Sequence, residues 1–392
     1  MRNACLLMSL VLYFGVVNGE FQVFNLKNYG AIDGGSVDNS QALLKAWDDA
    51  CKWKGERGAQ VLIPLGTYLT KDVILTGPCR GPIRFRIIGV LKAPAGRTGL
   101  DHWINIRYVD RLTVDGQGTF DGQGQTVWAQ PNSAQGRSYS NSALPSILSF
   151  AFVTNSRVRN IKLLNSKSTH FHIFGCDSLD INRIRIQAPE QSPNTDGIKI
   201  GVSRNIRISN SHIGSGDDCI ALLTGSNNIN ITGIHCGPGH GISIGSLGSS
   251  PDDHVSQILV RKCMFTNTMN GVRIKTWATN NPGSVSYITF KDIAINSAYN
   301  PIVIDQNYCP LNNCPKGNSH VQIGNVKFTN VTGTSMTNAV VNLQCSGSNP
   351  CTNIELTDIR MTYVGRPKGL GFQACSNVEG GASGVQIPKS CF

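Results

Sequence analysis

From about residue 150 onward, the chain repeats a short pattern rich in β-branched residues. The recurring segments are VRNIKLLNS, LDINRIRIQ, RNIRISNSHI, NNINITGIHC, QILVRKCMFTN, YITFKDIAI, GNVKFTNVT and TNIELTDIRM. Apolar and polar residues alternate within each segment, which indicates strands rather than helices. The segments recur at intervals of roughly 20–35 residues, the range of one coil of a solenoid. We therefore predict an all-β, single-domain parallel β-helix. A β-sandwich is the alternative, but it does not explain the sustained repeat.

Helical patterns are few, and the clearest runs from Asn39 to Cys51. There SQALLKAWDDAC follows a polar start and places Ala, Leu and Trp at helical intervals. A solenoid exposes apolar side chains and unpaired strand edges at its ends unless something covers them. We expect this short N-terminal helix to cap the open end. No linker separates a second domain.

The first 19 residues resemble a secretory signal. Met1 and Arg2 precede an apolar run from Ala4 to Val17, and the small residue Gly19 follows. The apolar run is too short to span a bilayer well, which argues against a membrane anchor. We expect residues 1–19 to be removed, leaving residues 20–392 as one secreted domain that does not associate with membranes.

Cysteine usage agrees with export. Of the 13 cysteines, Cys5 lies in the signal, so an even number remains, as an oxidising compartment favours. Close pairs are expected to form local disulfides, although the sequence does not fix the connectivity; they are Cys309/Cys314, Cys345/Cys351 and Cys375/Cys391. No C-x-x-C spacing indicates zinc, and we expect no metal and no cofactor. Two sequons, at Asn230 and Asn330, suit an exported glycoprotein.

The formal net charge of +11 favours an anionic partner. No run of lysine and arginine and no aromatic-rich basic stretch indicates nucleic acid, and the export signal argues against it. An acidic polysaccharide is the better fit. Because a capped solenoid needs no partner subunit, we expect a monomer.

Four short motifs follow one another in the middle coils. They are Asn194-Thr-Asp196-Gly, Gly216-Asp217-Asp218-Cys, Gly239-His240-Gly and Arg273-Ile-Lys275. Asp196 and Asp217 are 21 residues apart, and Asp217 and His240 are 23 apart, so each step is about one coil. Because parallel strands stack about 4.8 Å apart, successive coils should deliver these side chains to one surface site. Arg273 and Lys275 differ by two positions, so in a strand they point the same way.

Each motif also has an ordinary explanation. An aspartate beside a glycine is most often a turn former, a histidine between glycines can be an exposed loop residue, and Arg273 with Lys275 can be a solvated face. The adjacent pair Asp217 and Asp218 is harder to explain this way, since neighbouring carboxylates repel. The recurrence of all these groups at intervals of one coil indicates a functional site.

Paired carboxylates suit the inverting hydrolysis of a glycosidic bond. One carboxylic acid protonates the departing oxygen, and a carboxylate roughly 6.5–9.5 Å away activates water on the opposite side of the sugar. Crowding raises the proton affinity of one carboxylate, which keeps an acid available. Arg273 and Lys275 would bind a carboxylate on the sugar itself, and a neutral sugar would give them nothing to bind.

At these residues the chain resembles the polygalacturonases, inverting glycoside hydrolases with a right-handed parallel β-helix. All four family motifs are present in order, and the resemblance covers nearly the whole mature chain from the YGA segment at Tyr29. The resemblance places the proton donor on Asp217 and the water-activating carboxylates on Asp196 and Asp218. His240 is similar to the family's catalytic-site histidine.

The resemblance also assigns binding residues. Arg273 and Lys275 match the clamp for the substrate carboxylate, Asn194 matches a polar contact in the groove, and Tyr308 in IDQNYCP resembles a subsite tyrosine. Relatives often differ at Lys199, which we expect to extend the basic groove.

The stretch CGPGHGISIGSLG and the chain length resemble plant enzymes, and among them the pollen exopolygalacturonases, several of which are allergens. This implies a cell-wall enzyme that cleaves α-1,4-linked galacturonate from the non-reducing end. The alternatives are endo action, a calcium-dependent pectate lyase, and a non-catalytic pectin-binding solenoid. Exo action depends on loops that block one end of the groove, and the candidate walls are Pro131 to Pro145 and Gly248 to His254.

Overall fold

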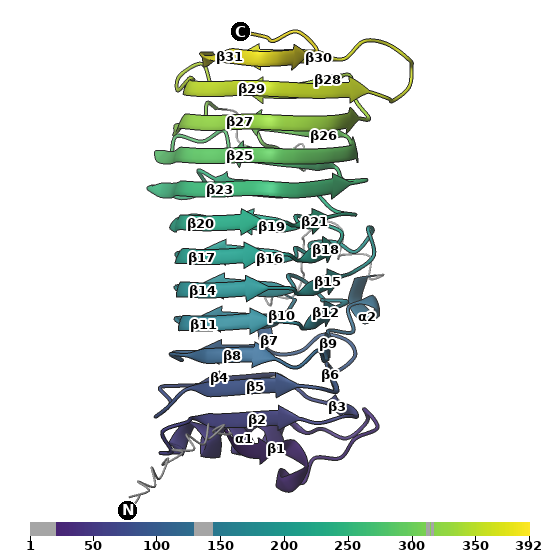
Figure 1. Cartoon of the computed structure of the whole chain (residues 1–392), viewed down its shortest axis with the longest axis vertical. Coiled ribbons are helices and arrows are strands. Elements are labelled where there is room, and N and C mark those ends of the chain that lie inside the picture. The colour runs from purple at the N-terminus through teal and green to yellow at the C-terminus, as the bar shows by residue number, and fades with distance from the viewer. Residues whose placement is uncertain (1–20, 129–143, 311–313, 315–316) are drawn as a thin grey trace, which may run out of the picture.

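The protein is a right-handed parallel β-helix (Figure 1). The computed structural model describes residues 21–128, 144–310, 314 and 317–392. The described strands pair in parallel and form two long sheets, one of eleven strands and one of twenty. The two ends of the stack lie at the two ends of the chain, so coils follow one another in sequence order (Figure 1). The predicted fold class is confirmed, while the expected signal at 1–19 lies outside the described residues.

The eleven-stranded sheet contributes one strand to each coil. Its strands are β4 (Val73–Thr76), β7 (His102–Arg107), β10 (Ser146–Ala151), β13 (Phe171–Phe174), β16 (Ile198–Gly201), β19 (Ile220–Leu222), β22 (Ile242–Leu247), β24 (Asn270–Thr276), β26 (Asn300–Asp305), β28 (Ala339–Gln344) and β30 (Phe372–Ser376).

The twenty-stranded sheet bends around a corner of the helix. Through most of the N-terminal half each coil supplies two short strands, and nearer the C-terminus one long strand runs through the corner. Its strands are β1 (Gln22–Asn25), β2 (Ala59–Ile63), β3 (Thr67–Leu69), β5 (Ile83–Ile87), β6 (Val90–Lys92), β8 (Leu112–Asp115), β9 (Thr119–Asp121), β11 (Thr154–Arg159), β12 (Lys162–Leu164), β14 (Asp177–Asn182), β15 (Arg185–Gln187), β17 (Arg204–Ser209), β18 (His212–Gly214), β20 (Ser226–Thr232), β21 (His235–Cys236), β23 (Asp253–Thr266), β25 (Gly283–Ala298), β27 (Val321–Ser335), β29 (Cys351–Tyr363) and β31 (Val378–Ile387).

The repeats found in the sequence are these bent coils. Each repeat runs along one half of the twenty-stranded sheet, turns the corner and continues along the other half. At the corner one residue adopts a left-handed backbone, as at Asn160 (φ 51°), Asn210 (φ 49°) and Asn330 (φ 52°). Asparagine accepts this conformation more readily than most residues. The recurring asparagines therefore mark the places where the chain bends.

The core consists of stacked aliphatic and aromatic side chains in register. One column of the eleven-stranded sheet pairs Phe171, Ile198, Ile220, Ile242 and Val272 in successive coils. All five side chains are fully buried. Since side chains alternate between the two faces of a strand, burying this column sends the residues between its members outward. The core thus decides which residues of the eleven-stranded sheet reach the surface.

The N-terminal end of the stack is capped by α1 (Ser40–Lys52), as predicted for residues 39–51. The buried face of α1 includes Leu43, Ala46 and Trp47, and the helix packs on β1, β2 and β4. The other helical segments described are a 3-10 turn, η1 (Leu26–Tyr29), and the short α2 (Gln125–Trp128). No helix among the described residues is long and apolar enough to cross a membrane.

Five disulfides are present. Three are the predicted local pairs Cys309–Cys314, Cys345–Cys351 and Cys375–Cys391; the other two are Cys51–Cys79 and Cys219–Cys236. Cys176 and Cys263 are free and buried. An even count of cysteines therefore does not produce full pairing here, because these two thiols point into separate parts of the core.

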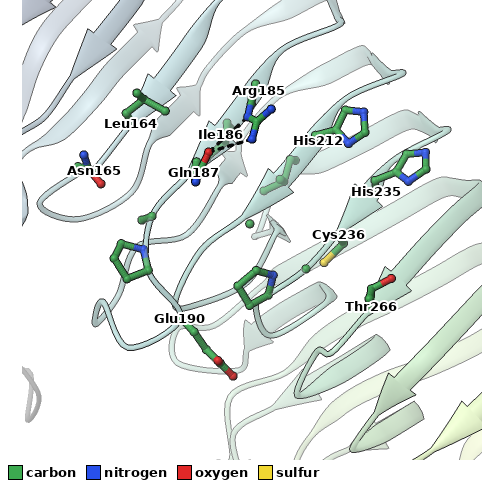
Figure 2. A pocket seen from close by; sticks show the side chains of 16 residues that line it. Leu164, Asn165, Arg185, Ile186, Gln187, Glu190, His212, His235, Cys236 and Thr266 are labelled. Atoms are coloured by element: carbon green, nitrogen blue, oxygen red, sulfur yellow. Dashed lines mark hydrogen bonds between the residues drawn. The ribbon is translucent and has the colours of Figure 1, made fainter.

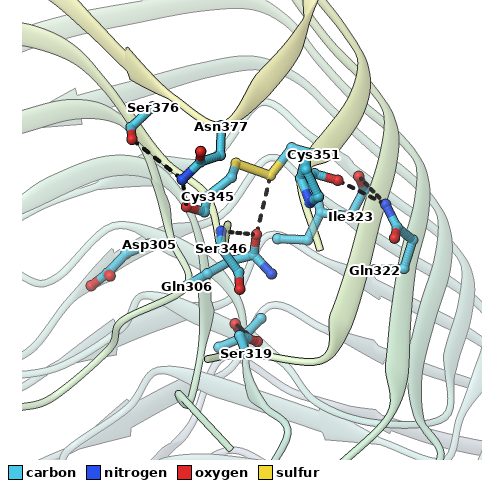
Figure 3. The surroundings of a disulfide bond; sticks show 12 residues. Asp305, Gln306, Ser319, Gln322, Ile323, Cys345, Ser346, Cys351, Ser376 and Asn377 are labelled. Atoms are coloured by element: carbon cyan, nitrogen blue, oxygen red, sulfur yellow. Dashed lines mark hydrogen bonds between the residues drawn. A yellow bond between two sulfur atoms is a disulfide. The ribbon is translucent and has the colours of Figure 1, made fainter. Parts of the chain in front are cut away.

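The Cys345–Cys351 disulfide closes a short loop over a buried amide (Figure 3). Gln306 is fully buried, donates to the carbonyl of Val321 at 2.8 Å and accepts from the amide of Ser346 at 2.9 Å. Both ends of this amide are therefore satisfied by backbone groups of later coils. The contact ties the coil of β26 to the coils that follow it.

Candidate active site

The acidic and imidazole side chains of the motifs occupy one row across successive coils. Ile198, Ile220 and Ile242 pair in register, and two positions before each of them stand Asp196, Asp218 and His240, respectively. These residues are in the turns that lead into β16, β19 and β22. Asp217 precedes Asp218 directly, so it belongs to the same turn. The one-coil spacing of the motifs is thus confirmed as a spatial row.

The glycines of the motifs allow these turns to stack closely. A β-carbon on Gly216 would lie 1.9 Å from the carbonyl oxygen of Ser192 in the preceding coil. Gly241 has φ +88°, and a β-carbon there would lie 2.3 Å from the carbonyl oxygen of Asn270. A side chain at either position would push the coils apart and disturb the row of motif side chains. Glycine is therefore required by close approach and, at Gly241, by the positive φ as well.

Asp217 and His240 form a pair on the outer side of the row. One carboxylate oxygen of Asp217 lies 3.2 Å from Nδ1 of His240. The same oxygen accepts the backbone N–H of Asp218 at 2.7 Å. Both side chains are partly exposed, so a ligand can reach them.

Asp218 is the centre of a buried charge cluster. One of its oxygens accepts from Arg273 at 2.9 Å and from Ser243 at 2.7 Å, and the other accepts from Lys275 at 2.8 Å. Arg273 also donates through Nε to Ser243 at 3.1 Å. Between the coils of Asp218 and Arg273, the outward column holds only Ala221 and Ser243. These small side chains leave the path along which Arg273 reaches back to Asp218.

Asp196 has a counter-ion of its own, because Nζ of Lys199 lies 3.2 Å from its carboxylate. Asp196 is buried, whereas Lys199 is partly exposed. Lys199 stands in the same outward column as Ala221 and Ser243. The cations at Lys199, Arg273 and Lys275 therefore follow one face of the eleven-stranded sheet, as expected for a basic groove.

The pKa values of Asp196 and Asp217 are shifted in opposite directions. Burial raises the pKa of Asp196 to about 6, and the charges of Asp217 and Asp218 add to this, against Lys199 and Lys275. Burial also acts to raise the pKa of Asp217, but the hydrogen bond and charge of His240, together with Lys275, outweigh it and hold the pKa at about 2. Below about pH 6 these shifts favour a proton on Asp196 over one on Asp217, whereas the resemblance makes Asp217 the donor.

Tyr308 contacts the cations of the site, whereas Asn194 lies in the turn before Asp196. The ring centroid of Tyr308 is 5.1 Å from Nζ of Lys275 and 5.8 Å from the guanidinium of Arg273. Trp277 packs against the same ring, 5.1 Å between centroids. Asn194 is exposed in the turn before Asp196, with a left-handed backbone at φ 55°. Among the described residues its side chain makes no hydrogen bond or ion pair with the other motif residues, so its place at the groove remains a prediction.

Comparison with known proteins identifies the family. The model of glycosyl hydrolases family 28 matches residues 54–386. The chain belongs to this family. An exopolygalacturonase of Platanus acerifolia is 42% identical over 377 residues, covering 95% of this chain and 98% of that protein. A polygalacturonase of Nicotiana tabacum is 41% identical over 389 residues, covering 98% of this chain and 96% of that protein.

Solved structures confirm the fold of this family 28 glycoside hydrolase. An endo-xylogalacturonan hydrolase from Aspergillus tubingensis superposes with a TM-score of 0.78 at 24% identity, covering 92% of this chain and 100% of that one. An exopolygalacturonase from Thermotoga maritima has a TM-score of 0.73 at 19% identity, covering 92% and 91%. The chain is thus an enzyme of the polygalacturonase family, as the motifs indicated.

One member of the family 28 site was missed from the sequence. Ser243 donates to Asp218 and accepts from Arg273, so it links the two motifs. The one sequence feature that could have identified Ser243 is its position three residues after His240, which places it on the outward face of β22. A serine in a glycine-rich segment has no distinctive pattern of its own. Only the register of neighbouring strands reveals its partners.

Asp217, Asp218 and His240 also form a possible metal-binding group, since their ligand atoms lie within 4.8 Å of one another. The chemistry of this family 28 site does not suit a divalent cation. Both oxygens of Asp218 are already bonded to cationic donors, Arg273 and Lys275. A divalent ion would have to compete with two buried positive charges for the same carboxylate.

A separate cavity of about 660 Å³ lies on the outside of β15, β18 and β21 (Figure 2). Its lining includes Arg185, His212 and His235 but none of the motif side chains. The cavity therefore lies behind the turns that carry the active-site row of this family 28 enzyme.

Proposed function

We propose that this hydrolase is a secreted polygalacturonase that cleaves α-1,4-galacturonosyl linkages with inversion and releases galacturonate from the non-reducing end. The observation that carries the proposal is the buried cluster of Asp218, Arg273 and Lys275 beside Asp196 and Asp217. Two cations share one carboxylate there, so the cluster of Asp218, Arg273 and Lys275 by itself carries a net positive charge. A sugar carboxylate next to Lys275 would neutralise it, and a neutral sugar would not.

Asp196 is the better base for activating water. The oxygens of Asp218 are held by three donors, Arg273, Ser243 and Lys275. These bonds leave Asp218 less free to accept a hydrogen bond from an attacking water. Asp196 has one cationic neighbour and a pKa near 6, so it is ionised above that pH and accepts a proton more readily.

Asp217, paired with His240, is the proton donor in this proposal. The pKa of Asp217 is held at about 2, mainly by the hydrogen bond and charge of His240 against burial, so its carboxylate is ionised before substrate binds. Lys275 contributes to this low value. A substrate carboxylate bound at Lys275 would offset that contribution and bring a negative charge near Asp217. The pKa of Asp217 would then rise, so that Asp217 carries the proton beside the departing oxygen.

Exo action is supported by the names of relatives. Proteins of Platanus acerifolia and Oenothera organensis, 42% and 43% identical, are exopolygalacturonases, whereas the Nicotiana tabacum relative is called a polygalacturonase without further detail. Of the two candidate walls, Pro131 to Pro145 lies almost wholly outside the described residues. In the other, Gly248 is hydrogen-bonded to Asp253 and accepts from Asn281, so this loop is held in place.

Secretion to the plant cell wall, expression in pollen and a monomeric state belong to the same proposal. The five disulfides support passage through an oxidising compartment.

The test is digestion of polygalacturonate, followed by reducing ends, product size and viscosity. Early release of monomer with little loss of viscosity is the expected result, and rapid thinning would replace exo with endo action. Ultraviolet absorbance from unsaturated products that a chelator abolishes would show a lyase instead. Binding without turnover would show a non-catalytic solenoid.

A further inference from the structure

A ladder of basic side chains runs along the outside of the helix, over the 660 Å³ cavity (Figure 2). Lys162 on β12 pairs in register with Arg185 on β15, which pairs with His212 on β18, which pairs with His235 on β21. All four side chains are exposed. Parallel strands lie about 4.8 Å apart, so the ladder extends over roughly 14 Å. We call these four residues the basic ladder.

The basic ladder has no acidic partner among the described residues. Arg185 donates to the neutral amide oxygen of Gln187 at 3.3 and 3.1 Å. The rings of His212 and His235 stack on each other, 4.6 Å between centroids. The carboxylate lining the cavity belongs to Glu190, which Figure 2 shows on the far rim, away from the histidines.

The other half of the same sheet is arranged differently. There arginines are paired with acids of neighbouring strands: Arg84 and Arg159 with Asp115, and Arg204 with Asp177. These three arginines therefore have their charges compensated by acids. Like charges placed directly opposite across a strand pair are destabilising, so the ladder carries a cost that those pairs avoid.

An anion bound over the ladder would remove this cost. The pKa of His212 is lowered by partial burial, and by the neighbouring His235 and Arg185. A bound carboxylate would oppose these influences and favour the charged imidazole. The gain in positive charge as the pH falls would in turn strengthen the attraction.

We propose that the basic ladder is a second binding site for polymeric uronate. The occupant is an extended polyanion rather than a single small anion, because the positive charges are spread over four successive coils. The same coils carry the active-site row: β15, β18 and β21 lead through single turns into Asp196, Asp217 and His240. The ladder therefore holds a segment of polymer beside the cleft and raises its local concentration. This inference rests on the proposed function, since it takes its ligand from there.

The test compares two sets of variants with polymer and with a short oligomer. The ladder variant is Arg185→Gln with His212→Gln and His235→Gln. The matched control is Arg157→Gln with Arg207→Gln, two exposed arginines on β11 and β17, in the other half of the sheet and without ion pairs among the described residues. Turnover of polygalacturonate and of trigalacturonate is measured at pH 5 and pH 7.

At pH 5 the ladder variant should show a KM for polygalacturonate raised about fivefold, the size expected for the loss of exposed ionic contacts, with kcat unchanged. The effect should be smaller at pH 7, and kinetics on trigalacturonate should match the unaltered enzyme. The control variant should behave like the unaltered enzyme on both substrates. An equal rise in KM for the control, or none for the ladder variant, would overturn the proposal.

A binding measurement separates this inference from the proposed function. Polygalacturonate binding is measured for Asp217→Asn with and without the ladder substitutions. A loss of affinity at pH 5 that accompanies only the ladder substitutions supports the second site even if the enzyme turns over neither substrate. Equal affinity of the two proteins contradicts it, whatever the activity.

Discussion

Arg273 reaches across two coils of the β-helix to donate to the carboxylate of Asp218 at 2.9 Å. Lys275, two residues along the same strand, donates to the other oxygen of that carboxylate at 2.8 Å. These contacts join the second and fourth motifs of the sequence into one buried cluster. The cations expected to bind substrate are thus already in contact with an acidic residue of the protein, and this arrangement can be tested through both stability and activity.

Replacing Asp218 by Asn should destabilise the protein strongly. Arg273 and Lys275 are 10% and 8% exposed, so the substitution leaves two nearly buried cations without an anion. Loss of one partner from a buried ion pair costs roughly 3–5 kcal/mol. Chemical unfolding should show this loss, and adding Lys275→Met should recover part of it. The control is Asp180→Asn, a partly exposed residue without an ion pair among the described residues. A D218N protein as stable as the unaltered one would contradict the cluster's role.

Replacing Asp217 by Asn should abolish turnover while binding persists. The side chain is partly exposed beside His240, and an amide cannot donate the proton that the leaving oxygen requires. Loss of a general acid lowers rates by roughly 10²–10⁴. Reducing ends released from polygalacturonate measure turnover, and Asp252→Asn serves as an exposed control. Normal turnover by D217N would remove Asp217 from the mechanism.

Titration of Asp196 should lower the free energy of unfolding as the pH rises from 4 to 7. Its pKa in the folded protein is raised to about 6, so its contribution is fully present below its unfolded pKa of about 3.9 and is lost as the pH rises through 6. Asp217 acts in the opposite sense. Its pKa is lowered to about 2, so its contribution is present above about pH 3.9 and disappears only as the pH falls towards 2.

The free energy of unfolding of the unaltered protein should therefore fall between pH 4 and pH 7 by roughly 2–3 kcal/mol more than that of Asp196→Asn. This figure follows from about 1.4 kcal/mol for each pKa unit. If Asp196 is the base, kcat/KM of the unaltered enzyme should also rise with an apparent pKa near 6. Parallel stability curves for the two proteins would show that Asp196 titrates normally.

The chain from residue 20 onward should contain two free thiols that react only after unfolding. Cys176 and Cys263 are buried, and burial raises the pKa of each to about 11, so neither forms the reactive thiolate at neutral pH. A chromogenic thiol reagent should find no rapidly reacting group in the native protein and two in denaturant without reductant. A count of zero in denaturant would mean that these cysteines are oxidised.

The sequence determined the solenoid and the row of motif side chains because both follow from a repeat. A buried apolar residue, most often isoleucine, recurs at the same position of successive coils, and this sets which neighbouring positions point outward. Asparagines such as Asn160 and Asn210 marked the corners, and the intervals between Asp196, Asp217 and His240 placed these residues on successive coils. The helix that caps the stack was visible in its own pattern.

Tertiary structure decided which groups are paired. Arg273 contacts Asp218 directly and also through Ser243, although these residues are far apart in sequence. The direct contact depends on small side chains in the intervening coil. The proton's location on Asp196 or Asp217 depends on burial and on the distance to His240 and Lys199, quantities that no spacing contains. Likewise the basic ladder arises only when strands align, because register sets the neighbours of each charge, and electrostatic energy depends on those distances in space.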